Sequence, residues 1–166
     1  MRVYLPCTMA RLRSVLDQGV VEVVVGYAVT PALREWYTEG DVEELEYAAT
    51  AAAARASLRL VAETGDQPRR VVLAAEVPDG EVRPVGGVGS DDRAAVALSA
   101  AVPLRQVESA LLDDPSAADD VRAATEVLAA ADAGDDDASF TVDAVEDHEL
   151  GWYAAQELAV LVEVES

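Results

Sequence analysis

One long helix is the feature that most constrains how this chain can fold. Asp41 and Glu44 match a capping box, the pair of residues that often begins a helix. The apolar residues that follow recur at steps of three and four, the spacing of one helical face: Val42, Leu45, Ala49, Ala52, Ala56 and Leu60. The pattern predicts a helix over about 41–63, which would be roughly 34 Å long and span a small domain. Ala54, Leu58 and Val61 lie on the opposite side, so we expect its second half to be covered on two faces.

Shorter patterns on either side of this helix predict a mixture of strands and helices. The connections between the middle strands are too short for crossover helices, which favours antiparallel pairing. The sequence therefore predicts a single α+β domain over 1–166, with a mixed or largely antiparallel sheet packed against alanine-rich helices. The glycine-rich segment at about 78–92 is expected to be a flexible loop. The other expected elements are strands at 2–6, 20–29, 70–77 and 93–102, and helices at 8–19, 31–37, 116–134 and 143–162. Residues 106–112 can form a strand or a helix, and a strand is favoured.

The charge of the chain restricts its partners. The sequence has 32 acidic residues against 12 basic ones, all of them arginine, for a net charge of −20. Residues 84–166 hold 19 of the acids and three of the arginines. Such a field repels phosphate backbones, which argues against nucleic-acid binding, and it would attract a basic protein partner or a divalent cation. Solubility alone also explains it.

Missing residue types exclude several kinds of chemistry. Lysine is absent, so the chain has no P-loop lysine, no Schiff base for a pyridoxal cofactor and no Ser-Lys dyad. Cys7 is the only cysteine, which excludes an intrachain disulfide and a four-cysteine zinc site, and favours a reducing compartment. No apolar run is long enough for a membrane span, and the first residues do not resemble an export signal. We therefore expect a cytoplasmic protein with no cofactor and no membrane contact.

Three reactive groups each have a structural and a functional interpretation. His148 is the only histidine, and a packed histidine beside Trp152 is favoured over a ligand or catalytic one. Cys7 precedes the first turn of a predicted helix, where a thiol can be activated, but a small buried residue is favoured. The aspartates near the C-terminal end lack the spacing of a calcium loop, which favours a solvated acidic loop over a metal site: Asp132, Asp135, Asp137 and Asp143.

Aromatic residues at two places form the main candidate for a binding site. Arg34, Trp36 and Tyr37 lie at the predicted corner before the long helix, and His148, Trp152 and Tyr153 lie on the predicted last helix. If the two groups meet, they form an aromatic pocket in which Arg34 could take a carboxylate or phosphate. Core packing, with Arg34 paired to an acid, is the alternative and the favoured interpretation.

Several sequence runs carry a resemblance to a known family. They are M-R-V-Y-L-P at 1–6, Y-A-V-T-P-A-L-R-E-W-Y at 27–37, E-L-E-Y-A-A at 44–49 and E-D-H-E-L-G-W-Y at 146–153. Together they resemble a family of small, acidic, uncharacterised cytoplasmic proteins from high-GC Gram-positive bacteria. The resemblance extends over nearly the whole chain and implies no assigned activity.

Three functional hypotheses therefore remain open. The first is a non-enzymatic accessory domain that binds a basic protein through its acidic half or its aromatic corner. The alternative from another class is a binder of anionic or aromatic small molecules, or a hydrolase, with a pocket between the 30–37 corner and the C-terminal helix. The third is a purely structural domain without a ligand.

Overall fold

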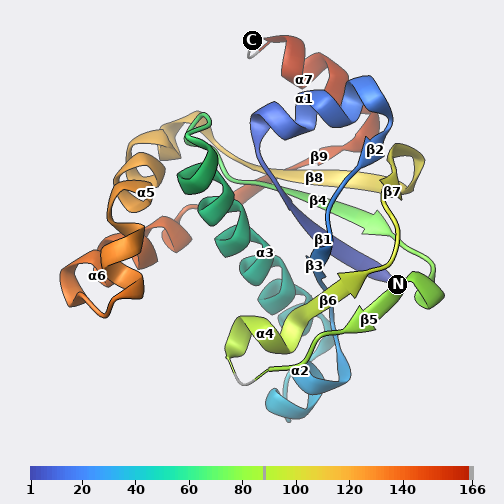
Figure 1. Cartoon of the computed structure of the whole chain (residues 1–166), viewed down its shortest axis with the longest axis horizontal. Coiled ribbons are helices and arrows are strands. Elements are labelled where there is room, and N and C mark those ends of the chain that lie inside the picture. The colour runs from blue at the N-terminus through green and yellow to red at the C-terminus, as the bar shows by residue number, and fades with distance from the viewer. Residues whose placement is uncertain (88, 165–166) are drawn as a thin grey trace.

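An antiparallel sheet with helices on both faces forms the body of the protein (Figure 1). The structure is a computed structural model and describes residues 1–87 and 89–164. The seven strands run in the order β5-β6-β3-β1-β4-β8-β9, and each neighbouring pair is antiparallel. The predicted α+β fold with a largely antiparallel sheet is confirmed. The strands are β1 (Arg2–Cys7), β3 (Val25–Tyr27), β4 (Val71–Glu76), β5 (Val82–Pro84), β6 (Ala95–Leu98), β8 (Val107–Asp113) and β9 (Leu150–Ala154), with β2 (Val20–Val21) and β7 (Val102–Pro103) as a separate pair.

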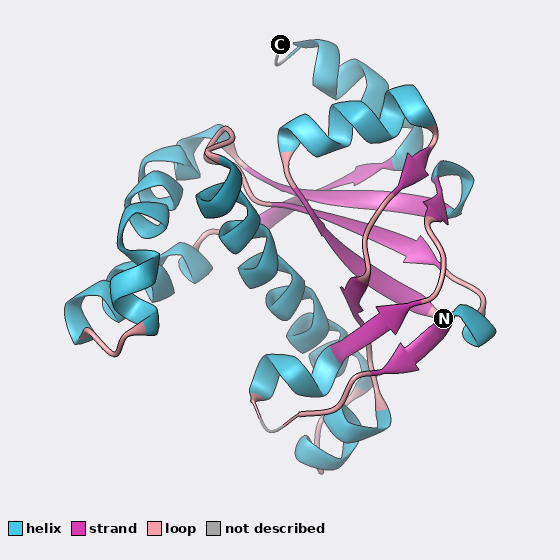
Figure 2. Ribbon diagram, viewed as in Figure 1, coloured by secondary structure: helices cyan, strands magenta, loops and turns pink. Residues whose placement is uncertain are grey.

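The helices divide between the two faces of this sheet (Figure 2). They are α1 (Met9–Gln18), α2 (Pro31–Trp36), α3 (Val42–Thr64), α4 (Ser90–Ala94), α5 (Ala118–Asp132), α6 (Asp136–Ala144) and α7 (Leu158–Val164). Val3 and Leu5 of β1 belong to the core beneath α1 and α7, whereas Tyr4 between them belongs to the core beneath α3. Because neighbouring strand residues point to opposite faces, α3 and the α1–α7 pair lie on opposite sides of the sheet.

The predicted long helix is confirmed as α3. The Asp41 carboxylate accepts a hydrogen bond from the Glu44 N–H at 2.9 Å, and Gly65, with φ of +70°, ends the helix. The helix is held to the sheet by Ser57, whose hydroxyl donates to the carbonyl of Cys7 and accepts from the N–H of Val71. Farther along, Leu58 packs in a separate small core with α5. Two-sided coverage of the second half of α3 is thus also found.

The predicted helix over 143–162 is wrong. A 3₁₀ turn at Val145–Asp147 is followed by β9, a second 3₁₀ turn and the short helix α7. β9 lies beside β8, with Trp152 opposite Leu111 and Gly151 opposite Leu112. The aromatic residues favour a strand and Gly151 disfavours a helix, and pairing with β8 outweighs the helical spacing of the apolar residues.

The glycine-rich segment at 78–92 contains more regular structure than a loop. It includes a 3₁₀ turn, β5 and the start of α4, while its residue 88 lies outside the described residues. Gly87 packs against Asp92, whose Cβ would lie 2.5 Å from a Cβ added at the glycine. The predicted flexibility of this segment stays a prediction. The predicted acidic loop is likewise largely helical, since Asp132 ends α5, Asp135 is the N-cap of α6, and Asp137 and Asp143 lie within α6.

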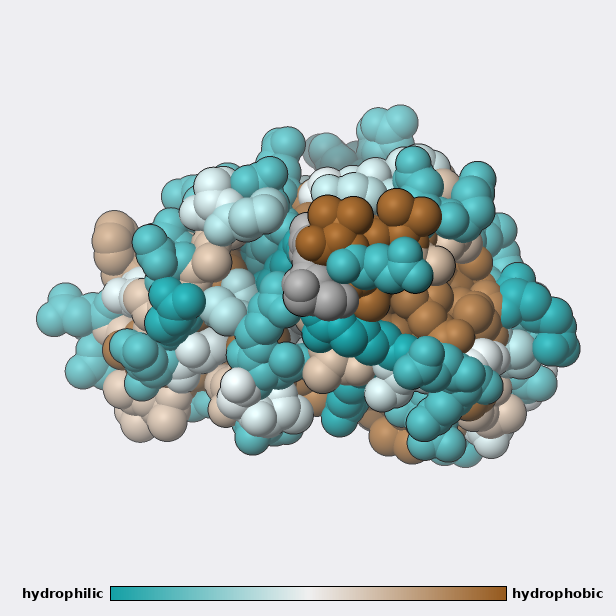
Figure 3. Space-filling view, turned by 90° about the horizontal axis from the view of Figure 1, so that it is seen from above, coloured by the Kyte–Doolittle hydropathy of each residue, from teal (hydrophilic) through white to brown (hydrophobic). Residues whose placement is uncertain are grey.

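The short helix α7 leaves part of its apolar surface uncovered. Leu158 and Val162 are buried against α1 and the sheet, but Val160 and Val164 are 62% and 77% exposed. Figure 3, which views the molecule from the side of α1 and α7, shows apolar side chains gathered on this part of the surface. The C-terminal end of the described chain is therefore only half covered.

Candidate functional site

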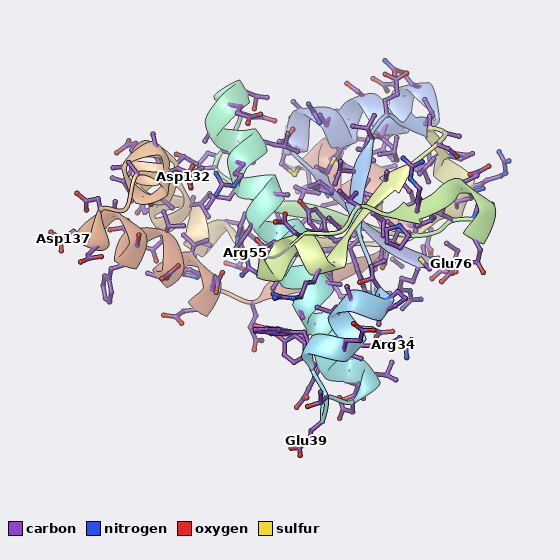
Figure 4. The ribbon with its side chains drawn as sticks, turned by 60° about the horizontal axis from the view of Figure 1, so that its bottom comes forward. Arg34, Glu39, Arg55, Glu76, Asp132 and Asp137 are labelled. Atoms are coloured by element: carbon purple, nitrogen blue, oxygen red, sulfur yellow. The ribbon has the colours of Figure 1, made fainter. Side chains whose placement is uncertain are left out.

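The aromatic corner before α3 lies on the surface. Trp36 is 58% exposed, and the Arg93 guanidinium of α4 stacks over its ring at 3.8 Å from the centroid. Arg34 and Tyr37 are also exposed, and Figure 4 shows Arg34 on the short helix α2. The corner is fixed from below by Thr30, whose hydroxyl caps α2 at the Leu33 N–H and also donates to the carbonyl of Arg93. The arrangement presents one face of an indole to solvent and covers the other with a cation.

The second group of predicted site residues lies at the far edge of the sheet. The strand β3 leads into α2 and the aromatic corner. Three strands, β1, β4 and β8, lie between β3 and β9, so β3 and β9 are about 19 Å apart. Trp152 is 64% exposed on the α3 side, and Tyr153 packs against the core of the opposite side. Trp152 and Tyr153 therefore cannot line one pocket, and neither joins Trp36.

His148 lies just before β9 and forms hydrogen bonds with Asp120 of α5 and with Arg70 before β4. Its Nε2 lies 2.6 Å from an Asp120 carboxylate oxygen on α5, and its backbone carbonyl accepts a hydrogen bond from Arg70 at 3.0 Å. The side chain is partly exposed. The contacts fix the start of β9 against α5. The Asp120 partner lies 28 positions earlier in the sequence, with no local signal that could have predicted it.

Arg70 also forms a buried ion pair that sequence reasoning missed. Its Nε and Nη2 donate to the two carboxylate oxygens of Asp113 at 2.9 and 2.8 Å, and its backbone N–H adds a third bond. The neighbouring Arg69 donates its Nε–H to the carbonyl of Asp113, and burial lowers the pKa of Arg69. The two consecutive arginines at the start of a predicted buried strand were the sequence signal that could have indicated a buried ion pair. They connect β4 to the end of β8.

The other reactive groups have structural contacts. Cys7 is buried, and burial raises the pKa of its thiol to about 12. Asp132 is paired with Arg59 of α3 at 2.8 Å, which keeps the pKa of that carboxyl below its usual value (Figure 4). Arg55, one turn earlier on α3, binds Asp91 of α4 and Glu146. Within the described residues, no group of three His, Cys, Asp or Glu side chains is arranged to hold a metal ion.

Two adjoining cavities lie where no site was predicted. They have volumes of about 330 and 480 Å³ and are open to solvent. Both lie between α5 and the segment that follows α3, and the larger one also reaches the C-terminal end of α3. Both are lined by Gln67, Pro68 and Arg122. Arg122 is exposed and pairs with Asp119 at 3.0 Å. The cavities can admit a small anion but have only this arginine in common as a positive side chain.

The main surface feature is the edge strand β9 with the acidic residues beside it. We call β9 together with the flanking Glu149 and Glu157 the C-terminal edge. β9 ends the sheet and pairs with β8 on its inner side. Both flanking glutamates are exposed, and Glu157 accepts a hydrogen bond from the Ala154 N–H at 2.8 Å. Residues 123–166 contain twelve acidic residues and no arginine or lysine. β9 is thus free of charged side chains itself and is flanked by two exposed glutamates.

The fold and these features define a single-domain α+β protein with an open, acidic sheet edge. The chain belongs to a family of unknown function (DUF6912), whose family model matches residues 1–162. No curated protein and no solved structure matches the chain. Among the described residues, no helix combines the length and the apolar character needed to cross a membrane.

Proposed function

We propose that this chain is a non-catalytic protein-binding domain that takes a basic partner at its C-terminal edge. The observation that carries the proposal is Trp152, a large aromatic side chain left 64% exposed on an edge strand that is flanked by the exposed carboxylates of Glu149 and Glu157. Large aromatic residues contribute most to interface energies when a partner buries them. Acidic surroundings favour a partner of the opposite charge and accelerate its approach.

The surroundings of the two candidate catalytic groups support a non-catalytic role. The thiol of Cys7 is buried and stays protonated at neutral pH because its pKa is about 12. His148 and Asp120 form an acid–base pair, but among the described residues no serine, threonine or cysteine side chain is hydrogen-bonded to the imidazole. A histidine–carboxylate pair needs such a nucleophile for covalent catalysis.

The setting that we propose is the cytoplasm of a high-GC Gram-positive bacterium. The single reduced cysteine supports a reducing compartment. The absence of lysine, isoleucine and asparagine is the composition expected from a GC-rich genome, and it supports the bacterial group.

The test is capture of partner proteins from a lysate of the source organism by the immobilised protein. We expect Trp152→Ala to reduce the capture of a specific band, and raised salt to weaken it further. Phe140→Ala is the matched control, because Phe140 is 78% exposed and belongs to α6, not to β9. Capture that is equally strong with Trp152→Ala would contradict the proposal.

A second candidate function is the binding of a small anion, and the two cavities beside Arg122 favour it. A carboxylate or phosphate there would compete with Asp119 for the guanidinium. Inorganic phosphate should then raise the melting temperature of the wild type but not of Arg122→Ala. An equal rise in both proteins would refute a site at Arg122.

A further inference from the structure

The two edges of the sheet are built differently. β5 has three residues and includes Arg83 and Pro84, both exposed. A charge and a proline on an edge strand prevent another chain from pairing with it. β9 at the other end has five residues, L-G-W-Y-A, with neither charge nor proline, and its pairing with β8 runs without a bulge. One edge is protected against strand addition, and the other is not.

The free side of β9 has backbone groups suited to an added strand, except at Ala154, whose N–H already donates to the Glu157 carboxylate. In an antiparallel strand, every second residue directs its N–H and C=O away from the neighbour it is paired with. Gly151 and Trp152, in the middle of β9, are exposed. Gly151 has no side chain to obstruct an approaching backbone, and Trp152 could cover a side chain of the incoming strand on the α3 face.

The charge around β9 selects the kind of strand that can approach. Asp147 and Glu149 precede β9 and Glu157 follows it, and all three are exposed. No arginine or lysine follows Arg122 in the sequence. A second copy of this chain also carries a net charge of −20, and repulsion between the like charges opposes self-association. An arginine- or lysine-rich segment is attracted instead.

We propose that β9 takes an extended basic segment of a partner protein as an eighth strand of the sheet. The inference rests on the proposed protein-binding function and specifies its mode. The backbone of the segment pairs with the free side of β9, its apolar residues pack on Trp152, and its basic residues pair with the flanking carboxylates. Main-chain pairing would supply affinity, and the acidic rim would supply the preference for a basic sequence.

A short fluorescent peptide alternating arginine and valine is the probe, and its glutamate–valine counterpart is the charge control. We expect the basic peptide to bind in fluorescence anisotropy and the acidic one to fail. Trp152→Lys, which adds a protecting charge to the edge, should weaken binding about 30-fold. Val164→Lys is the matched control, because it adds the same charge at a 77% exposed position on α7 and should retain binding. Circular dichroism checks that both variants are folded.

N-methylation of the peptide separates strand addition from other modes of binding. Methylating alternate amides blocks one edge of an extended peptide, so two peptides, each blocked on one edge, are compared. Strand addition predicts that one of them binds and the other does not. It also predicts slower hydrogen exchange of the β9 amides when the unmodified peptide is bound.

Each other outcome overturns the inference in a distinguishable way. Strand addition is refuted, while the protein-binding function stands, under three joint conditions. Both methylated peptides bind, the β9 amides stay unprotected from exchange, and binding still depends on Trp152. If neither the basic peptide nor any lysate protein shows binding that depends on Trp152, the proposed function fails as well. If β9 becomes protected without peptide as the protein forms a dimer, the occupant is a second copy and the basic segment is refuted.

Discussion

Arg70 and Asp113 form a doubly hydrogen-bonded ion pair inside the protein, with side chains only 5% and 1% exposed. The pair joins the residue before β4 to the last residue of β8, and Arg70 continues the contact to the backbone of His148. Two internal strands and the start of the edge strand are thus connected through one guanidinium group.

The first prediction concerns the loss of one partner of this pair. Asp113→Ala should lower the free energy of unfolding by about 3–5 kcal/mol, because it leaves a buried, uncompensated charge on Arg70. Urea unfolding followed by circular dichroism measures the change. Asp119→Ala removes an exposed partner of Arg122 and should leave the midpoint unchanged. Equal effects of the two substitutions would show that the buried pair contributes no more to stability than the exposed one.

The second prediction concerns the contact between α3 and the sheet. Ser57→Ala should destabilise the fold by about 1–3 kcal/mol, because the Cys7 carbonyl and the Val71 N–H both lose a buried partner. Chemical denaturation again gives the value. Ser14→Ala, which removes an exposed hydroxyl on α1, is the matched control and should be neutral. A Ser57 variant as stable as the control would mean that this contact is dispensable.

The third prediction concerns the close approach of β3 to β1. A Cβ at Gly26 would lie 2.6 Å from Cγ1 of Val3 and 3.1 Å from Cδ2 of Leu5, both fully buried. Gly26→Ala should therefore cost about 1–3 kcal/mol through overpacking. Gly80→Ala meets no atom within 4 Å and serves as the control. Thermal unfolding of the two variants side by side is sufficient, and an unchanged melting temperature for Gly26→Ala would contradict the tight packing.

The fourth prediction concerns the pH dependence caused by Cys7. Its thiol has an ordinary pKa of 9.0 in the unfolded chain and about 12 in the fold, because burial disfavours the thiolate. Below pH 9 both states keep the proton, so the full contribution to stability is present. Between pH 9 and 12 only the unfolded chain loses it, and the free energy of unfolding falls by about 1.4 kcal/mol per pH unit.

Comparison with Cys7→Ala isolates this contribution, since the other groups titrate in both proteins. The difference in stability between the two should be constant below pH 9 and should shift against the wild type above it. The same burial predicts that the folded protein resists iodoacetamide at neutral pH and reacts once it is unfolded in urea. Rapid alkylation of the native protein would refute both expectations.

Local signals in the sequence account for the parts of the fold that were predicted correctly. Asp41 and Glu44 fix the start of α3, and Gly65 takes the left-handed conformation that ends it. The same kind of signal gives α1 its bounds at Thr8 and Gly19. These residues bond within their own turns, so no distant part of the chain is needed to interpret them.

The prediction for the final strand failed because pairing with a neighbouring strand determines the conformation of this segment. Leu150, Ala154, Leu158 and Leu161 recur at a helical spacing, yet 150–154 pairs with β8, which lies about 40 positions earlier. The predicted site shared this weakness, since it required Trp36 and Trp152 to lie on adjacent helices. In the structure Trp36 lies on α2, which follows β3, whereas Trp152 lies on β9 at the far edge of the sheet. The partners of His148 and Arg70 likewise could not be predicted from any local pattern.

The sequence by itself determined that this chain is a single acidic α+β domain with a capped central helix, because spacing, capping and charge are local or additive properties. Only the tertiary structure decided that L-G-W-Y-A forms an open sheet edge and that Arg70 is paired with Asp113. Strand order and buried ion pairs depend on which distant segments meet, and that depends on the packing of the whole core.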